Sequence, residues 1–278
     1  MTDRVQVPGR RLLARYCVLI GLAVIVVGPI YIAVAIAIQP GTRIVDFPAL
    51  LVPRSVELGA FRTAFDQAHL GRYLLNSILV TTAIVAGQVL TSVLAAYAFA
   101  FLDFPFRRTL FLVFLATLMV PTEATLVANY DTIVRLQWLD TYQALIVPFL
   151  ATAFGTFLLR QAFLGIPRDL RDAAALDGFG HLGFLRHVAL PLARPALAAF
   201  TVFSVLLAWN QYLWPLLVTN EDRHRTVQIG LKAIASSRLE ELNVTLAGAI
   251  LAALPIFVLL VVFQRQLVRG ITSGAVKG

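Results

Sequence analysis

Polar residues inside long apolar runs give this sequence its clearest means of handling a solute. Glu123 follows Pro121 within one apolar run, and the string Trp209-Asn210-Gln211-Tyr212 lies late in another. Such residues are expensive to place in lipid, so within a membrane they usually mark a pathway or a binding site. A carboxylate and amides can hydrogen-bond hydroxyl groups, and aromatic rings can stack on a ligand. We predict a substrate pathway formed by Glu123, Trp209, Asn210, Gln211 and Tyr212.

Structural roles are the alternative for several polar side chains. One alternative places Glu123 at the outer membrane interface, where it is solvated or paired with an Arg of a partner subunit. Tryptophan and tyrosine gather at membrane interfaces, and we expect that position for Trp214. Asn76, Gln88 and Ser92 are expected to support helix packing.

Catalytic and metal-binding groups form no recognisable constellation. The histidines lie outside the apolar runs, and His181 and His187 are six residues apart, a spacing that does not share one helical face. No stretch fits G-x-x-x-x-G-K-[ST], so the sequence has no P-loop phosphate cradle. The single cysteine, Cys17, excludes an internal disulfide. We expect no catalytic residue, no metal and no bound cofactor; an intramembrane hydrolase or acyltransferase is the remote alternative.

Composition indicates a membrane protein. The chain is 59% hydrophobic and 14% charged, with mean hydropathy +0.82. Several apolar runs exceed the roughly 18 residues that indicate a bilayer-spanning helix. The net charge of +8 comes from scattered basic residues without a basic helix, so we expect no nucleic-acid partner. Membrane lipid is the expected surrounding.

The apolar runs predict an all-α membrane protein with six transmembrane helices. The predicted spans are 12–38, 73–102, 110–127 with a break at Pro121, 142–163, 196–218 and 242–268. A polar link at 129–140 and a polar outer loop at 219–241 separate later spans. We expect residues 1–71 to hold the N-terminus, first span and an outer segment, residues 72–268 a transmembrane domain, and residues 269–278 a C-terminal tail.

Basic residues predict the orientation of the spans. If the N-terminus lies inside, 14 of the 23 Lys and Arg residues fall in inner segments and nine fall in outer segments, where many acids accompany them. Cytoplasmic segments carry an excess of Lys and Arg. Both termini and the polar stretch 167–195 are therefore expected on the cytoplasmic side.

Residues 167–195, PRDLRDAAALDGFGHLGFLRHVALPLARP, form a polar stretch between two apolar runs. Pro167 suits the opening of a helix, where its missing N–H costs nothing. The alanines 173–175 favour helix and allow another protein to approach the backbone closely. Gly178 can take the left-handed conformation that ends a helix. The stretch predicts a short helix and turn on which another protein can dock.

This stretch resembles the EAA loop of ABC-importer permeases, whose pattern is E-A-A, three residues, G, nine residues, I, one residue, L-P. Seven positions match without insertion, with Asp172 in place of Glu and Val188 in place of Ile. The resemblance implies a type I ABC importer transmembrane domain whose cytoplasmic coupling helix contacts an ATPase. The residues implied for that contact are Asp172, Ala173, Ala174, Asp177, Gly178, Leu190 and Pro191.

The resemblance also implies partners. They are a homologous second permease subunit, two copies of a cytoplasmic ATPase that bind ATP and Mg, and an extracytoplasmic solute-binding protein, all at a prokaryotic plasma membrane. Nearly the whole chain is similar to the second permease subunit of carbohydrate-type (maltose-like) importers. In that subfamily the terminal tail reaches the ATPases, which implies a regulatory role for the tail residues Ser273, Gly274 and Lys277.

Three strings suggest the substrate. MVPTEATL (119–126), FLLRQAF (157–163) and WNQYLWPLL (209–217) are most similar to the permease of glycerol-3-phosphate and glycerophosphodiester importers. Glycerol-3-phosphate or glycerophosphodiesters such as glycerophosphocholine are therefore the expected substrates. No predicted span centre holds an Arg or Lys for a phosphate, so a neutral di- or oligosaccharide of the maltose or trehalose type is the alternative.

Overall fold

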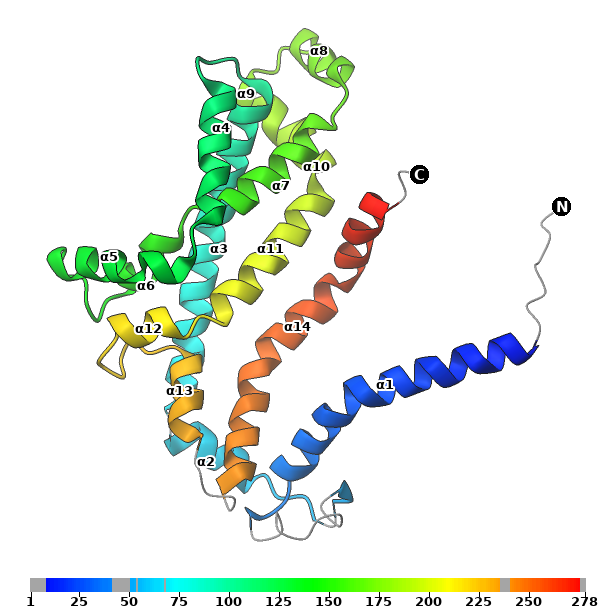
Figure 1. The fold of residues 1–278 in the computed structure, drawn as a ribbon, viewed down its shortest axis with the longest axis vertical. Coiled ribbons are helices and arrows are strands. Elements are labelled where there is room, and N and C mark those ends of the chain that lie inside the picture. Colours follow the sequence, from blue (N-terminus) through cyan, green and yellow to red (C-terminus); the bar gives the residue numbers. More distant parts are fainter. Residues whose placement is uncertain (1–8, 42–50, 54, 68, 236–240, 276–278) are drawn as a thin grey trace. The chain divides into compact units, whose positions relative to one another are not determined.

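The computed structural model describes residues 9–41, 51–53, 55–67, 69–235 and 241–275, with only the backbone at 9–11, at 14, at 67 and from 265 onward. The described residues fall into two compact units, one within 1–70 and 231–252 and the other within 71–230 and 253–278. Every regular element in this part of the chain is a helix, which confirms the predicted all-α class (Figure 1).

The first unit contains α1 (Gly9–Ala37), α2 (Gly59–Gln67) and the start of α14 (Leu242–Ala275). The first predicted span is confirmed as the long apolar helix α1. Small residues pack these helices together, with Ala37, Ala64 and Ala247 fully buried. The buried Asn243 side chain donates a hydrogen bond to the carbonyl of Gln39 at 3.1 Å.

Three helices in the described residues are long and apolar enough to cross a membrane, with the qualifying windows Arg15–Ala37, Leu70–Phe101 and Leu242–Gln264. α3 (Leu70–Phe101) confirms the second predicted span and has no proline, whereas α1 and α14 contain Pro29 and Pro255. Three further pairs of helices qualify only as bent pairs. The number of spans is six if each bent pair counts as one.

The predicted third span 110–127 is not one straight helix. α4 (Arg107–Ala116) continues through a 3₁₀ turn to Met119, and α5 (Thr122–Arg135) leaves at 96°. Pro121 has no N–H to continue the helix, and it holds the preceding residue, Val120, in an extended conformation. The expected polar link 129–140 is therefore helical as far as Arg135.

The fourth and fifth predicted spans are also broken. α6 (Tyr142–Ile146) and a 3₁₀ turn meet α7 (Ala153–Leu164) at 42°. α11 (Arg194–Trp209) ends within the predicted span 196–218, and α12 (Leu213–Val218) begins after three non-helical residues. α11 also makes an 80° bend with the segment that precedes it, which contains α9 (His181–Phe184), a π-helical turn at Leu185–Ala189 and α10 (Leu190–Leu192).

The expected outer loop and the expected C-terminal tail both contain helix. α13 (Val227–Ile234) lies inside the expected outer loop 219–241. α14 continues through residues 269–275, so the backbone at Ser273 and Gly274 is helical rather than an extended tail. Lys277 lies outside the described residues.

The main core of the second unit joins α3, α7, α9 and α11. Its fully buried members include Ala96, Leu159 and Phe163. Gly155 on α7 lies where a Cβ atom would overlap the Phe200 ring and the Ser92 hydroxyl. This close approach is possible only because glycine has no side chain.

Gly155→Ala is expected to destabilise the protein, because overpacking a close-packed core typically costs about 1–3 kcal/mol. Thermal unfolding of the purified protein in detergent measures the effect. Gly21→Ala on α1 is the matched control, since a Cβ there meets nothing within 4 Å. Equal unfolding temperatures for Gly155→Ala and the wild type would contradict the packing described.

Candidate functional site

The polar stretch 167–195 folds as predicted from its start and stop signals. α8 (Arg168–Leu176) follows Pro167, and Gly178 has φ +80°. The N–H of Phe179 donates to the carbonyl of Ala174 at 2.9 Å, and the N–H of Gly178 donates to Ala175 at 3.1 Å. These two bonds form a Schellman motif, which requires a left-handed residue at Gly178. The end of α8 is therefore fixed by backbone geometry.

α8 buries one alanine and presents the rest of its surface. Ala174 is 5% exposed and belongs to the main core, whereas Leu176 is 90% exposed. Leu170, Phe179 and Leu182 are also exposed apolar residues around the helix. The other residues implied in ATPase contact, Asp172, Ala173, Asp177 and Gly178, are exposed as well. Leu190 and Pro191 are half-buried in α10, away from α8 in sequence.

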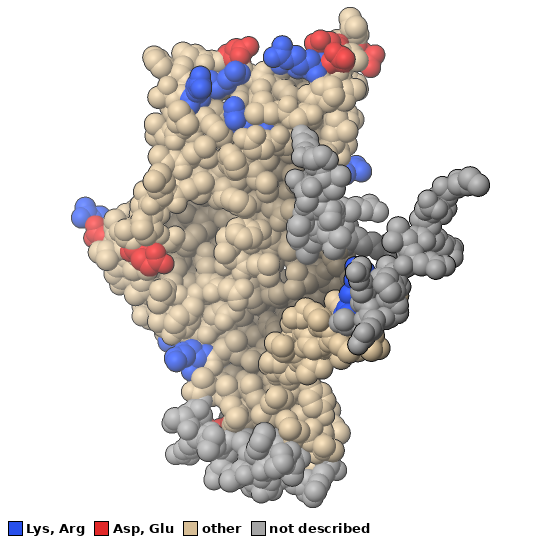
Figure 2. All heavy atoms as spheres, turned by 45° about the vertical axis from the view of Figure 1, so that its right-hand side comes forward, with Lys and Arg blue, Asp and Glu red and all other residues tan. Residues whose placement is uncertain are grey.

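Charged side chains surround this helix. Figure 2 shows blue and red side chains gathered at the end where Figure 1 places α8. Arg171 lies with its guanidinium 6.0 Å from the Phe101 ring of α3. An exposed helix with apolar side chains among charges has the composition of a protein-docking surface.

A pocket of about 330 Å³, which we call the Glu123 pocket, gathers four of the five predicted pathway residues among mainly apolar surface. Glu123, Asn210, Gln211 and Tyr212 line it. Its remaining lining residues are Thr122, Leu126, Asn129, Phe149, Leu213 and Trp214. Among these described lining residues there is a carboxylate, three amides and a phenol, but no Lys or Arg.

Two interruptions of helical structure create this pocket. The bend at Pro121 puts Glu123 in the first turn of α5, where the helix dipole favours a carboxylate. The break after Trp209 leaves Asn210, Gln211 and Tyr212 between α11 and α12. Non-helical backbone in a membrane protein is tolerated where it lines a cavity. Glu123 is exposed and lines this pocket, so the pathway position stays a prediction beside the interfacial one.

Trp209 does not share this pocket. Its side chain is buried and lines a separate, apolar cavity of about 460 Å³ between α3, α11 and α14, together with Thr81, Thr201 and Pro255. The four-residue string thus divides between two cavities, because the helix ends at Trp209 and the chain changes direction there.

Trp214, for which a membrane-interface position is predicted, does not present its ring to the surroundings. Trp214 is 7% exposed, its indole N–H donates to the carbonyl of Ala144 at 2.9 Å, and its ring packs edge-on against Phe149. This indole and ring together form one wall of the pocket. Phe149 was missed because a single aromatic residue beside Pro148 carries no sequence signal of a site.

The three residues expected to support packing do so differently. Asn76 and Gln88 make long-range hydrogen bonds, to the carbonyls of Arg223 and Phe149 respectively, both at 2.9 Å. Ser92 is fully buried without a hydrogen-bond partner for its hydroxyl among the described residues.

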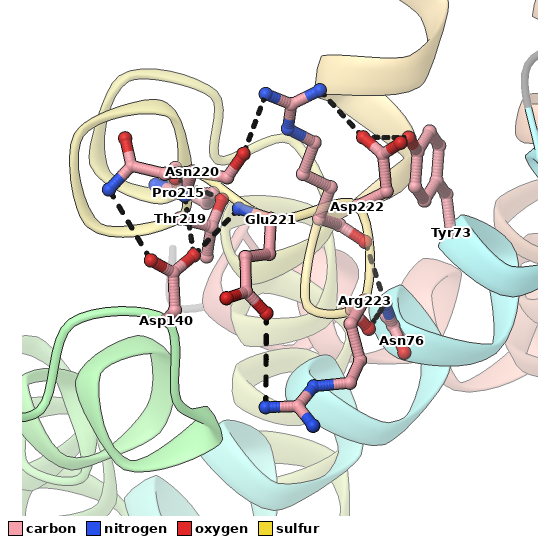
Figure 3. A network of polar contacts seen from close by, with 10 residues as sticks. Tyr73, Asn76, Asp140, Pro215, Thr219, Asn220, Glu221, Asp222 and Arg223 are labelled. Carbon is pink, nitrogen blue, oxygen red and sulfur yellow. Dashed lines mark hydrogen bonds and ion pairs between the residues drawn. The ribbon is translucent and has the colours of Figure 1, made fainter.

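A hydrogen-bond network joins the segment that follows α12 to α3 and to Asp140, which lies between α5 and α6 (Figure 3). The Asp140 carboxylate accepts from the backbone N–H groups of Asn220 and Glu221. Asp222 accepts from the Tyr73 hydroxyl at 3.0 Å and from Arg225 at 2.8 Å. We call residues 219–226 the outer turn, because they begin the segment 219–241 that the sequence predicts on the outer side.

His224 lies inside this turn. It is buried, and its ring meets the Tyr142 ring edge-on at 4.8 Å. Burial lowers the pKa of His224 below its ordinary 6.5; Arg223 lowers it further, and Asp140 and Glu221 oppose that. For Asp140, burial raises the pKa, but the N–H donors of Glu221 and Asn220 outweigh burial and the pKa lies below 3.8.

Acid is expected to destabilise the outer turn. Both groups have a folded pKa below the unfolded one, so their stabilisation is present above the unfolded pKa and is lost as pH falls. The His224 contribution is lost first, below about pH 6.5. Thermal unfolding between about pH 8 and about pH 5 should show a fall that His224→Phe reduces, since Phe keeps the ring contact. An unchanged fall in His224→Phe would contradict this role.

Comparison with known proteins agrees with this architecture. Residues 88–273 match the family of binding-protein-dependent transport system inner membrane components. The chain is 35% identical over 277 residues to the sn-glycerol-3-phosphate transport system permease protein UgpE of Brucella abortus (strain 2308), which covers 96% of this chain and 98% of that protein. UgpE of Rhizobium meliloti (strain 1021) is 36% identical over 275 residues, covering 96% and 97%.

Two further relatives extend the comparison. The arabinooligosaccharides transport system permease protein AraQ of Halalkalibacterium halodurans is 33% identical over 260 residues, covering 92% of this chain and 93% of that protein. A chain in the crystal structure of a bacterial ABC transporter involved in the import of the acidic polysaccharide alginate has the same fold, with TM-score 0.82 at 22% identity over 95% and 98% of the two chains.

The family match covers more than half of the chain, and the relatives match nearly all of it. The family is one of membrane subunits that are not themselves catalytic. The chain belongs to the binding-protein-dependent transport system inner membrane components and is a multi-pass permease subunit of an ABC importer.

Proposed function

We propose that this permease couples to a cytoplasmic ATPase through α8 and forms half of the substrate pathway. The observation that carries the proposal is the construction of α8. Its end is fixed by the turn at Gly178, Ala174 is anchored in the main core, and Leu176 projects into the surroundings. A helix held in this way can receive a displacement from outside and pass it to the spans as a rigid lever.

The partners follow from the importer class. A homologous second permease completes the pathway, and a solute-binding protein delivers substrate from outside. Two ATPase copies that bind ATP and Mg contact the coupling loop of each permease, which in this chain is residues 167–195. The bias of basic residues supports cytoplasmic termini and a cytoplasmic α8. Residues 72–268 are the transmembrane domain, residues 1–71 precede it, and residues 269–278, with Ser273, Gly274 and Lys277, reach the ATPases.

The Glu123 pocket receives the solute on its way through. Glu123, Asn210, Gln211 and Tyr212 provide acceptors and donors for hydroxyl groups, and Trp214 with Phe149 provides an aromatic wall. ATP binding draws the ATPases together, α8 transmits the movement, and the pocket opens outward to accept the solute; hydrolysis resets it.

The substrate we favour is glycerol-3-phosphate or a glycerophosphodiester. The UgpE relatives, similar over nearly the whole chain, support this class. The pocket lining, which includes no Lys or Arg among its described residues, gives a specific reason to consider a neutral oligosaccharide as the second candidate. AraQ, a permease for arabinooligosaccharides, is nearly as similar. If the substrate is glycerol-3-phosphate or a glycerophosphodiester, its phosphate is held by another subunit.

Cross-linking tests the docking of α8. Because the only native cysteine is Cys17, a Cys17→Ser background with Leu176→Cys provides one reactive thiol. A photoactivatable thiol reagent on that cysteine is expected to link the permease to its co-expressed ATPase in membranes. Val127→Cys on the exposed face of α5 is the control and should give no such product. Linkage from Val127→Cys but not from Leu176→Cys would overturn the proposal.

A further inference from the structure

One helix of the second unit touches both the coupling loop and the outer turn. α3 has 32 residues, so it is about 48 Å long at 1.5 Å per residue. It contains no proline and no break, unlike the bent pairs and the two other long helices in the described part of the chain. A helix without a kink transmits an axial or rotational displacement with little loss, whereas prolines and breaks are the usual sites of bending.

The coupling-loop end of α3 is fixed by Tyr97. This side chain is buried in the main core, and its hydroxyl lies 3.0 Å from Nδ1 of His181, the first residue of α9. The two rings also meet edge-on. One turn further along α3, Phe101 packs edge-on against Phe184, and Arg171 of α8 lies over the same ring. Three side chains of the coupling loop, those of His181, Phe184 and Arg171, therefore attach it to α3.

The other end of α3 is fixed to the outer turn. The Asn76 amide donates to the carbonyls of both Arg223 and Arg225 at 2.9 Å, and its oxygen accepts from Tyr142. The backbone N–H of Val227 donates to the Ser77 hydroxyl at 2.8 Å. Tyr73 adds its bond to Asp222, as Figure 3 shows. These bonds are buried or half-buried, so losing one leaves polar groups without partners.

We infer that α3 is the strut through which the coupling loop and the outer turn move together, with Tyr97–His181 and Asn76 as its two end joints. The inference rests on the proposed function, which places ATPases at one end and the binding protein at the other. It goes further in naming the helix and the residues that carry the movement. Tyr97 and Asn76 are positioning residues, because neither lines the pocket.

Two joints in series predict a non-additive result. The complete importer would be placed in lipid nanodiscs, and ATPase activity measured without and with substrate-loaded binding protein. Tyr97→Phe removes one hydroxyl and keeps the ring, and Asn76→Leu keeps the branching at Cγ while removing both hydrogen-bonding atoms. Each should reduce the stimulation ratio about fivefold or more, the lower range of coupling between distant sites. The stimulation ratio of the double variant should be no lower than that of the single variant with the lower ratio.

Conservative variants separate positioning from folding. Asn can place its side-chain oxygen near the position of Nδ1, so His181→Asn should restore stimulation that His181→Ala loses. Tyr130→Phe on α5 also removes only a hydroxyl, belongs to neither joint, and should match the wild type. If Asn76→Leu does not insert, Tyr73→Phe replaces it at the same end.

The outcomes divide clearly. Normal stimulation in Tyr97→Phe and Asn76→Leu, or effects that multiply in the double variant, would overturn the strut and leave the proposed function intact. The proposed function itself would be overturned if the wild-type permease assembled with no ATPase. It would also be overturned if substrate-loaded binding protein did not stimulate ATPase activity in the wild-type complex.

Discussion

Gly178→Pro is expected to abolish uptake while the permease still inserts in the membrane. Gly178 has φ +80° and donates its N–H to Ala175, and proline can provide neither the angle nor the donor. The mismatch costs about 3 kcal/mol, which corresponds to roughly a 100-fold change in an equilibrium constant. α8 would lose its fixed end and with it the transfer of force. Uptake of labelled substrate by cells, with membrane content of the permease, measures the effect.

Gly180→Ala is the matched control for this experiment. Gly180 lies two residues further along the same turn, has φ −75°, and a Cβ there meets nothing within 4 Å. Its uptake should equal that of the wild type. Asp172→Lys, which reverses one exposed charge on α8, should also abolish uptake. Normal uptake in Gly178→Pro would mean that the turn does not matter for coupling.

Glu123→Gln is expected to change the kinetics of uptake without disturbing assembly with the ATPase. The carboxylate lines the Glu123 pocket at the first turn of α5, where it can accept hydrogen bonds from the hydroxyl groups of a solute. A hydrogen bond to a charged group contributes about 1.5–3 kcal/mol, so transport efficiency should fall roughly 10-fold to 100-fold. Initial uptake rates over a range of substrate concentrations measure it.

Asp131→Asn on the same helix is the control for Glu123→Gln. Asp131 is exposed, pairs with Arg135 at 2.9 Å, and does not line the pocket. Surface pairs of this kind contribute little, so this variant should transport normally. Unchanged kinetics in Glu123→Gln would return Glu123 to an interfacial role.

Local rules predicted local structure well. The ends of α8 follow from Pro167 and Gly178, because helix start and stop signals act over one turn. The long apolar helices α1, α3 and α14 follow from hydropathy. Glu123 and Asn210 were both predicted to line a substrate pathway, but no sequence rule placed them next to each other. The structure brings both to one pocket.

Directions of helices could not be read from hydropathy. A hydropathy window reports composition, so it joined α4 to α5 across the 96° bend and α11 to α12 across the break at 210–212. The first of these has Pro121 as a local signal, and the second has Pro215 in the first turn of α12, where the missing N–H cannot bond to the carbonyl of Gln211. The direction that α12 then takes was not readable, because contacts such as the bond from Trp214 to Ala144 join residues 70 apart.

Tyr97 shows the same limit. In the sequence it is one aromatic residue in an apolar run, and its partner His181 is 84 residues away. The sequence can predict that such a helix is buried on one side, but it cannot predict which loop lies against that side.

Transport by the reconstituted importer tests the central claim most directly. The permease, its second permease, the ATPase and the cognate binding protein would be placed in liposomes, and ATP-dependent uptake compared for glycerol-3-phosphate, glycerophosphodiesters and neutral oligosaccharides. We predict ATP-dependent accumulation of the phosphorylated solutes in the wild type and none in Gly178→Pro. Accumulation of oligosaccharides alone would replace the substrate and keep the coupling. ATP-dependent uptake that Gly178→Pro leaves unchanged would contradict coupling through α8.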